Sequence, residues 1–444
     1  MSTTPEPETG MSDYLFILDS HLSADQNRVL EQVQAAAGAA GVNLFLTGGG
    51  MRDMMGGFRI RDLDFSVEGN SLKVAKTLEE QGARIVALDE VRRTAELIFA
   101  NGVTGQIAMS RRERYAKAGG KPQVTPASIQ EDLRGRDFTI NAIALSLNRA
   151  SRGLLLDPTN GLADLGHREM RSTHPYVFYD DPVRLLRLIR LRIRFGFTVE
   201  ERTQAQFENA RAAKMETLIP ASALSQELLN VAAESNACEV VQALEQENLL
   251  TLFSPALTNA KSNLQGLGRL EKAERLVESA NLSAEPRVTL FLHALTAKMT
   301  PREKSEFLKA ASLPKSELER LRNLEPQAHK VELALRSARV RKPSHVYEIL
   351  AAADAASIVF LLAHSEQKAV QERVRNYLQK YLPIMQEATA SDWQAIEGQP
   401  GTPKYKRNRQ AFLAARLDVR PRKPAEAEAE GGPPADAVAR ERAN

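Results

Sequence analysis

The sequence contains very little cysteine and no strong excess of charge of either sign. Cys238 is the only cysteine among 444 residues, which excludes an internal disulfide or a zinc site built from several cysteines and favours a reducing compartment. The 59 Lys and Arg residues are nearly balanced by 56 Asp and Glu residues, for a net charge of +3. This balance argues against a protein that coats DNA, so no DNA partner is expected.

Long apolar runs are also missing. No stretch approaches the roughly 20 apolar residues that a membrane-spanning helix needs. Residues 1–10 are polar and acidic, without the basic and apolar regions of a signal peptide, so we expect no membrane partner and a cytoplasmic location. With 43% hydrophobic and 26% charged residues, the composition is typical of a globular protein. At roughly 100–200 residues per domain, the length indicates two to four domains.

Strand-like and helix-like patterns are mixed only in the first part of the chain. A helix is predicted over 72–81, and the predicted strands cover residues 42–46, 62–67, 84–88, 96–99 and 104–109. After about residue 165, helical periodicity rich in Ala, Leu, Glu, Lys and Arg replaces the alternation of strands. These patterns predict an α+β fold, in which a mixed sheet with helices precedes an all-α region.

The same changes in character set the expected domain boundaries. The final segment is rich in Ala, Glu, Pro and Gly and has almost no large apolar residue, which predicts disorder. We expect a polar leader over 1–27, a mixed α/β domain over 28–165, helical segments over 166–250, 251–324 and 325–420, and a disordered tail over 421–444.

Two aspartates at the second predicted strand are the most informative feature. Asp62 and Asp64 are two positions apart, so a strand places both carboxylates on one side. Such a pair suits Mg²⁺, which proteins bind through one or two carboxylates together with substrate phosphates. Upstream, the predicted turn Gly48–Gly50 allows a phosphate to approach the backbone N–H groups. Arg52 follows in the expected first turn of a helix, where anions are also favoured.

The order of these elements is more specific than any one of them. Alone, an Asp-x-Asp is more often a solvated strand end, and a glycine run is more often a plain turn. The chain has a strand, then Gly-Gly-x-x-Arg-Asp, then a short helix and then Asp-x-Asp. This order resembles the opening motif of class II tRNA nucleotidyltransferases, the family of CCA-adding enzymes and bacterial poly(A) polymerases. The resemblance implies a polymerase-β-like catalytic head in which Asp62 and Asp64 hold catalytic Mg²⁺, while Gly49 and Arg52 contact the incoming nucleotide.

A second segment, Arg136-Asp137-Phe-Thr-Ile-Asn-Ala, resembles the family motif that recognises ribose. By themselves, Arg136 and Asp137 are a charged pair that either binds a phosphate or hydroxyl group or orients a turn. The resemblance implies that both belong to the nucleotide site. Gly135 stands where the family has a further Arg. Gln106 stands where family members often have a third acidic residue beside the aspartate pair, and we expect two acids to suffice.

A helix with an arginine-rich face is predicted after residue 181, with Gly196 as its C-terminal stop. Asp181 is a good N-cap with proline at the next position, and the leucines and isoleucines lie opposite an arc of roughly 120° that carries Arg184, Arg187, Arg190 and Arg194. Such a face is usually just solvated. Here no acids are interleaved, so like charges repel and a bound anion is expected.

This stretch resembles the family's Glu-Asp-x-x-Arg motif, with Asp180 in place of Glu. The resemblance implies that Asp181 and Arg184 hydrogen-bond to the Watson–Crick edge of the incoming base, with Arg187 and Arg190 also contacting the nucleotide. An aspartate accepts from the exocyclic amine that C and A carry, and unpaired buried groups reject other bases. CTP or ATP would then be selected by side chains, without a nucleic-acid template.

The resemblance covers residues 44–197. It implies a Mg²⁺-dependent tRNA nucleotidyltransferase that adds CCA to the tRNA 3′ end from CTP and ATP, with helical neck, body and tail domains that hold the acceptor arm. A CC-adding, A-adding or poly(A) polymerase relative remains open, as does a catalytically weak RNA-binding protein of the same fold. Near the end, a basic patch with aromatic residues either contacts RNA or is ordinary surface, and consists of Trp393, Lys404, Tyr405, Lys406, Arg407 and Arg409.

Overall fold

The computed structural model describes residues 11–258, 260–283 and 285–419. The chain forms two compact units, each described by itself below. The first comprises the residues up to 271 together with 287–321, and the second comprises 272–286 and the residues from 322 onward. The predicted boundaries at 165, 250 and 324 remain predictions, and the predicted disordered tail lies outside the described residues.

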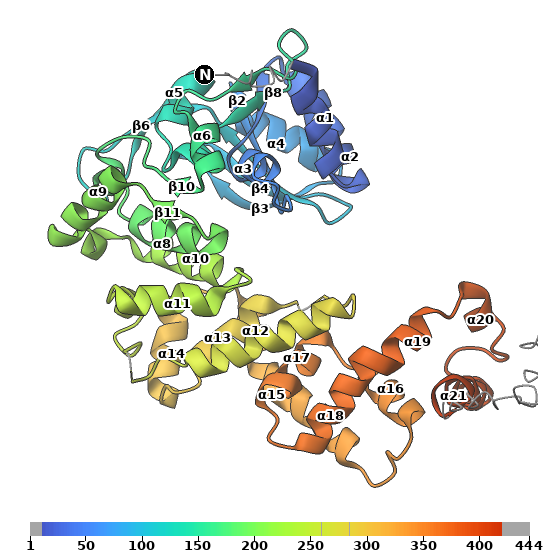
Figure 1. Ribbon diagram of the computed structural model, residues 1–444. Coiled ribbons are helices and arrows are strands. Elements are labelled where there is room, and N and C mark those ends of the chain that lie inside the picture. The colour runs from blue at the N-terminus through green and yellow to red at the C-terminus, as the bar shows by residue number, and fades with distance from the viewer. Residues whose placement is uncertain (1–10, 259, 284, 420–444) are drawn as a thin grey trace, which may run out of the picture. The chain divides into compact units, whose positions relative to one another are not determined.

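A mixed sheet forms the centre of the N-terminal part of the first unit (Figure 1). Its strand order is β3-β4-β5-β2-β1-β8-β9, and only β2 and β5 pair in parallel. The strands are β1 (Asn43–Thr47), β2 (Leu63–Glu68), β3 (Arg84–Asp89), β4 (Thr94–Ile98), β5 (Thr104–Met109), β8 (Ala144–Ser146) and β9 (Leu155–Leu156). The strands predicted over the first 109 residues are thus confirmed, with ends shifted by at most two residues.

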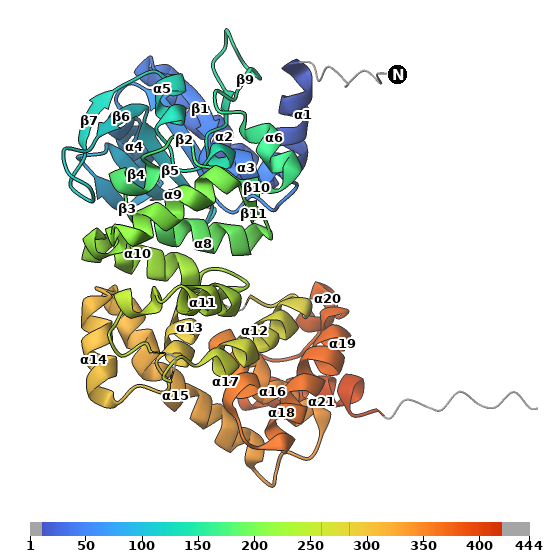
Figure 2. The same cartoon turned by 60° about the vertical axis from the view of Figure 1, so that its left-hand side comes forward.

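Helices cover this sheet, as Figure 2 shows from a second side. Helices α2 and α4 pack against each other and against the strands, and the apolar side chains between the layers, such as Leu46, Phe65 and Leu78, are almost fully buried. The helices here are α1 (Met11–His21), α2 (Ala24–Ala40), α3 (Gly48–Met55), α4 (Ser71–Glu80), α5 (Ile129–Arg134) and α6 (Gly161–His167). A separate antiparallel ribbon joins β6 (Arg111–Arg114) and β7 (Gln123–Pro126).

Helix α1 corrects the interpretation of residues 1–27 as a polar leader. Leu15, Leu18 and Leu22 recur at helical spacing, and Leu18 and Leu22 are buried. This apolar stripe gives residues 11–21 a surface to pack, so they are part of the folded unit.

After the sheet, the first unit is almost entirely helical. Two short strands, β10 (Glu169–Met170) and β11 (Thr198–Val199), pair in parallel around the start of this region. The helices are α7 (Val177–Asp180), α8 (Arg184–Phe195), α9 (Glu201–Ala212), α10 (Ala221–Ala232), α11 (Ala237–Gln246), α13 (Arg287–Leu295) and α14 (Pro301–Ala310). Helices α12 (Leu264–Ser279) and α15 (Lys315–Arg336) each run from one unit into the other.

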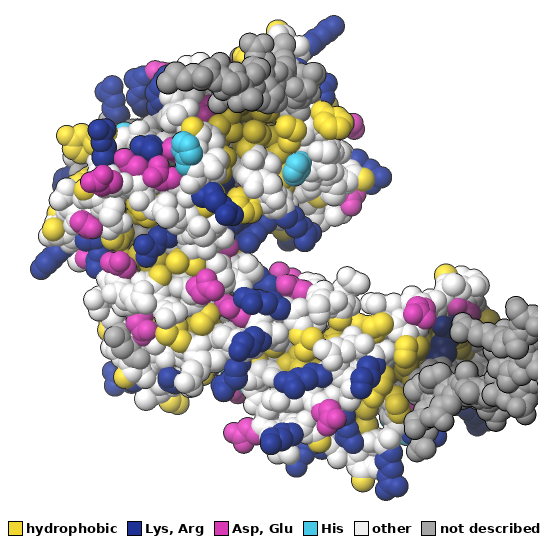
Figure 3. All heavy atoms as spheres, in the orientation of Figure 1, with side chains coloured by type: hydrophobic (Ala, Val, Ile, Leu, Met, Phe, Trp, Pro, Cys, Tyr) yellow, Lys and Arg dark blue, Asp and Glu magenta, His cyan; other side chains and the backbone are white. Residues whose placement is uncertain are grey.

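The second unit is helical throughout its described residues. Its further helices are α16 (Pro343–Ala351), α17 (Ala355–His364), α18 (Lys368–Asn376), α19 (Leu382–Gln386), α20 (Ala390–Gln394) and α21 (Pro403–Leu417). Figure 3 shows Lys and Arg side chains scattered among apolar and neutral ones on the face of this unit that it displays. The prediction of an α+β fold, a mixed N-terminal sheet followed by a largely helical region, is confirmed.

Across the part of the chain that the structure describes, no single helix is long and apolar enough to cross a membrane. The bent pair α16 and α17 meets that test only jointly, by length and composition.

Candidate active site

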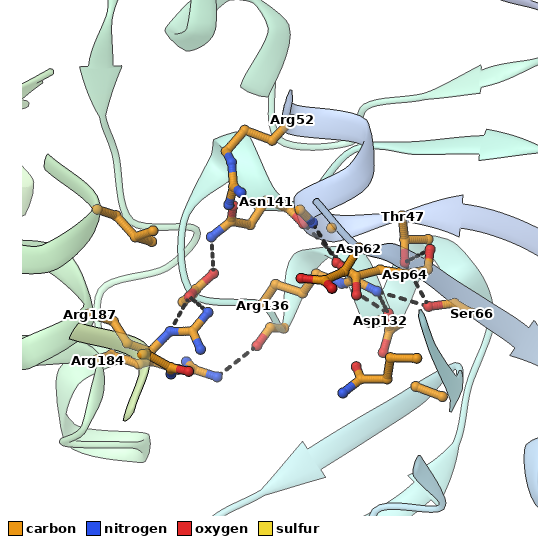
Figure 4. A pocket seen from close by; sticks show the side chains of 18 of the residues that line it. Thr47, Arg52, Asp62, Asp64, Ser66, Asp132, Arg136, Asn141, Arg184 and Arg187 are labelled. Carbon is orange, nitrogen blue, oxygen red and sulfur yellow. Dashed lines mark hydrogen bonds and ion pairs between the residues drawn. The ribbon is translucent and has the colours of Figure 1, made fainter. Parts of the chain in front are cut away.

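The aspartate pair lies where β2 begins. Asp62 directly precedes the strand and Asp64 is its second residue. Because β1 and β2 are antiparallel neighbours, the start of β2 lies beside the end of β1 and the first residues of α3. Both carboxylates line one cleft of about 520 Å³, and Figure 4 shows them next to each other. The pair is therefore on one surface, as the strand spacing predicted.

Glycines let the backbone of α3 approach Asp64 closely. The Gly49 N–H donates to Asp64 Oδ2 at 2.9 Å. A Cβ atom on Gly49 would lie 3.0 Å from that oxygen, and one on Gly48, whose φ is +62°, would lie 3.1 Å from it. The predicted turn is thus already the first turn of α3, so Arg52 lies in the second turn and not, as expected, in the first.

Burial and like charge disturb the ionisation of Asp64. Desolvation, and secondarily the charge of Asp62, raise the pKa of Asp64 to about 6. A divalent cation between the two carboxylates would relieve both effects, so the pair fits Mg²⁺, which completes its shell with water and phosphate oxygens. Gln106 faces Asp64 across the β2–β5 pairing, and no group of three or more His, Cys, Asp or Glu residues is placed to hold a metal within the described ranges.

Two further expected ligands, Arg52 and Arg136, are fixed by partners inside the cleft. Arg52 is only 6% exposed. It pairs with Asp53 at 2.7 Å, donates to Asn141 Oδ1 at 2.6 Å and lies 4.6 Å from the centre of the Phe195 ring.

Arg136 is held in a similar way. It pairs with Asp132 at 2.8 Å and donates to the Ser66 hydroxyl at 3.0 Å. Such partners hold the two guanidinium groups in place before any ligand binds.

Helix α8 starts later than the sequence suggested. Its first residue is Arg184, whose N–H donates to the carbonyl of Asp181 at 3.0 Å in a tight turn. Asp181 is the C-cap of α7 and not the N-cap of α8, so this prediction is wrong: the residues from Asp181 to Val183 form a turn between the two helices. Gly196, with φ of +64°, ends α8 as predicted.

The expected base-reading pair is the least constrained part of the cleft. Arg184 is buried and donates only to the carbonyls of Val177 and Gly135 within the described part of the chain. No side-chain hydrogen bond or ion pair of Asp181 occurs among the described residues. Both side chains line the cleft and are available to a ligand.

Asp137 and Arg187 are paired with each other. Arg187 Nη2 lies 2.7 Å from Asp137 Oδ2, and the other carboxylate oxygen accepts from Phe138 N and Asn141 Nδ2. Burial alone would raise the pKa of Asp137, but the positive charges of Arg187 and Arg184 hold that pKa well below its usual range. In this arrangement Asp137 positions Arg187.

The last two arginines of the predicted face, Arg190 and Arg194, are neutralised by acids from other elements. Arg190 pairs with Glu227 of α10 at 2.6 Å and with Glu234 at 3.0 Å, and Arg194 pairs with Asp53 of α3 at 3.0 Å. The argument that an acid-free face implies a bound anion is therefore wrong, because it considered only neighbours within one helix.

Sequence reasoning missed these acids, although one signal was present. Glu227 and Glu234 are seven residues apart, two helical turns, in a stretch that is otherwise largely apolar. Two acids on the same side of such a stretch indicate buried partners, since glutamate is rarely buried unpaired.

All ten of the predicted site residues nevertheless line the same cleft. They come from α3, the start of β2, the loop after α5, the turn between α7 and α8, and the first two turns of α8. They are Gly49, Arg52, Asp62, Asp64, Arg136, Asp137, Asp181, Arg184, Arg187 and Arg190.

Comparison with known proteins gives a consistent result. Residues 44–171 match the family model described as the poly A polymerase head domain. The chain is 26% identical to an A-adding tRNA nucleotidyltransferase of Geobacter sulfurreducens over 91% of its own length and 47% of that protein. It is 38% identical to an A-adding tRNA nucleotidyltransferase of Halalkalibacterium halodurans over 44% of its length and 46% of that protein.

A CC-adding tRNA nucleotidyltransferase of Deinococcus radiodurans is 33% identical over 38% of the chain and 45% of that protein. The chain thus spans less than half the length of these curated relatives.

Solved structures share the fold over most of the chain. A CCA-adding enzyme in an apo form matches with a TM-score of 0.53 and 24% identity, over 92% of this chain and 96% of that one. A tRNA nucleotidyltransferase complexed with a primer tRNA and an incoming ATP analogue matches with a TM-score of 0.54 and 27% identity, over 80% and 99%.

Proposed function

Because this chain belongs to the class II tRNA nucleotidyltransferase and poly(A) polymerase head-domain family, we propose that it transfers nucleotides to the 3′ end of tRNA. The observation that supports this most directly is the single cleft in which an aspartate pair, a glycine-lined helix start and the arginine-bearing helix α8 meet. In the reaction, the 3′-hydroxyl oxygen bonds to the α-phosphorus of the incoming nucleotide, the hydroxyl proton is released, and pyrophosphate leaves.

The aspartate pair has the composition of a magnesium site. Asp62 and Asp64 would hold Mg²⁺, which when bound supplies the positive charge that stabilises the attacking and leaving oxygens of phosphoryl transfer. Arg52 and Arg136 bind phosphate and ribose oxygens from fixed positions, so little ordering entropy is lost when the nucleotide binds.

Asp181 and Arg184 select the base in this proposal. The carboxylate of Asp181 accepts from the exocyclic amine of cytosine or adenine, and Arg184 donates to a ring nitrogen or carbonyl. Both groups line the cleft and are covered by the base when it binds, so a base lacking the amine leaves a carboxylate unpaired. This is the physical basis for a preference for CTP and ATP. Arg187 and Arg190 lie on the same face of α8. Asp137 holds Arg187 in position, and Glu227 holds Arg190.

The product is the finer part of the proposal. The sequence motifs predict addition of CCA, and family members named for A addition, CC addition and multifunctional CCA synthesis are all similar to this chain. Addition of A alone is a second candidate, supported by the names of two of the relatives described above.

One experiment separates these products. Purified protein is incubated with Mg²⁺, labelled CTP or ATP, and tRNA transcripts that end before the CCA, after the first C or after both Cs, and the products are sized on a gel. Stepwise extension of all three supports CCA addition, and extension of the last transcript alone, by one A, supports A addition. Lack of incorporation on every transcript contradicts the proposed activity. Asp62→Ala is the matched negative control.

The C-terminal patch contributes less charge than the sequence implied. Lys404 pairs with Glu397 at 3.0 Å and Arg409 lies 3.7 Å from Glu348. Trp393 packs against Phe412. This leaves Lys406 and Arg407 as the exposed cations that carry the proposed contact with the RNA backbone.

A further inference from the structure

A buried cluster of arginines and carboxylates lies beside the aspartate pair. It joins α3, the segment before β2, α8 and the turn after α10. Its arginines line the cleft, and each is ion-paired within the cluster. The members are Arg52, Arg61, Arg190, Arg194, Asp53, Glu227 and Glu234. Four arginines therefore share three carboxylates, and the cluster carries an excess of one positive charge.

Glu234 contacts more of these arginines than any other carboxylate of the cluster. It lies in the turn after α10, where its N–H donates to the carbonyl of Val231 at 3.1 Å, and its side chain is 2% exposed. Its carboxylate is 3.0 Å from Arg190, 3.1 Å from Arg61 and 3.8 Å from Arg194. A buried carboxylate is tolerated only with such partners, so this turn is built around the arginines.

The cluster is short of negative charge even with Glu234 in place. Burial and the charge of Arg52 lower the pKa of Arg194 to about 10, while Glu234 and Asp53 act in the opposite direction. Removing one carboxylate therefore leaves a second arginine uncompensated in a poorly solvated environment.

The positive charge of the cluster extends to the aspartate pair. Arg61 directly precedes Asp62, and its side chain, which is 39% exposed, lines the cleft. On the other side, the Cβ position of Gly49 is 3.0 Å from Asp64 Oδ2 and 3.3 Å from Arg52 Nη2. Arginines of the cluster thus flank both aspartates, and any uncompensated charge there repels a cation.

We propose that Glu234 is a positioning residue for the cation site. By pairing with Arg61, Arg190 and Arg194, it compensates their positive charge beside the aspartate pair and so sets the local charge at which a divalent cation binds. The inference rests on the proposed function, since it concerns the cation that this function requires.

The test measures binding of Mn²⁺ directly, by the loss of the electron paramagnetic resonance signal of the free ion. Four variants of the full chain are compared with the unaltered protein: E234Q, R61Q, E234Q/R61Q and E239Q. Glu239 is an exposed glutamate on α11 and provides the matched control. Circular dichroism checks that each variant is folded.

The expected result is a loss of Mn²⁺ affinity of roughly three- to tenfold in E234Q and none in E239Q. The second substitution in E234Q/R61Q restores the affinity, because it removes the cation that Glu234 had compensated. R61Q alone binds Mn²⁺ more tightly than the unaltered protein, and this variant decides the matter if E234Q does not fold. A purely structural role of Glu234 would give a loss that R61Q does not rescue.

Unchanged Mn²⁺ affinity in E234Q and R61Q overturns the inference about Glu234 alone, provided that the unaltered protein binds Mn²⁺ and incorporates nucleotides. If the unaltered protein does neither, the proposed function itself fails. The two failures are therefore distinguishable in one set of samples.

Discussion

Replacing Asp137 by Asn tests whether the pair with Arg187 holds α8 against the sheet-containing part of the first unit. The amide oxygen of the variant can still accept from Phe138 N and Asn141 Nδ2. Its NH₂ group, however, takes the place of the carboxylate oxygen to which Arg187 donates at 2.9 and 2.7 Å in the unaltered protein. Removing one partner of a fully buried pair costs about 3–5 kcal/mol. Arg187 is 37% exposed and can turn toward water, so we expect a loss of about 2–3 kcal/mol in the free energy of unfolding.

Two spectroscopic probes localise this effect. The single tryptophan, Trp393, lies in the second unit, so its fluorescence during urea unfolding reports that unit, whereas circular dichroism reports both. We expect D137N to shift the circular dichroism transition to lower urea, with the tryptophan transition moving only if the two units unfold together. D25N is the matched control, because the Asp25–Arg28 pair is 51% and 74% exposed and such pairs contribute about 0–1 kcal/mol.

The pH dependence of the same variant gives a second measure. The pKa of Asp137 is held below its usual value in the folded protein, so its stabilising effect is complete above the unfolded pKa of about 4 and is lost as the pH falls below that value. The difference in stability between the unaltered protein and D137N should therefore shrink between about pH 4 and the acid limit of folding. A D137N protein as stable as the D25N control, or a difference that grows toward acid pH, refutes this account of the pair.

Further predictions concern the cleft. D62A and D64A abolish nucleotide incorporation into tRNA without changing the circular dichroism spectrum; appreciable incorporation in either removes the magnesium assignment. G49A places a Cβ 3.0 Å from Asp64 Oδ2, so we expect the incorporation rate in single-turnover assays to fall about tenfold or more. A rate equal to that of the unaltered protein would show that the close approach of Gly49 to Asp64 is not needed. D181N replaces an acceptor by a group that also donates, so the preference for CTP and ATP over UTP and GTP should fall, read from competition between labelled nucleotides; unchanged preference assigns base selection to other residues.

The sequence was sufficient to predict features that depend on short-range order. Alternation of polar and apolar residues indicated β2, and the i, i+2 spacing of Asp62 and Asp64 predicted that the two carboxylates lie together at the start of that strand. Gly196 ended α8 where a left-handed residue was needed. Each of these follows from chain geometry over a few residues, so no tertiary information was required.

Features that depend on distant partners could not be predicted in this way. Four acids from outside α8 pair with its arginines: Asp53, Asp137, Glu227 and Glu234. The farthest of them lies 141 positions from its partner along the chain. Nothing in the helix itself indicates them. The turn that begins at Asp181 was missed for a related reason: Pro182 suits the first turn of a helix and also a tight turn, so the local sequence does not decide between the two.

The partners of the arginines divide the cleft into a fixed part and an available part. Arg52, Arg136, Arg187 and Arg190 each have a carboxylate partner within 3 Å, so their positions are set before a nucleotide enters. A fixed cation binds phosphate at little entropic cost, but it is partly neutralised and contributes little discrimination between bases.

Arg184 and Asp181 differ, because Arg184 donates only to backbone carbonyls in the described structure and Asp181 has no side-chain partner there. Both side chains can therefore form hydrogen bonds with a ligand, and a base that matches both leaves neither polar group unpaired when it binds. In the proposed function, specificity for the base and affinity for the triphosphate are thus carried by different residues of one cleft.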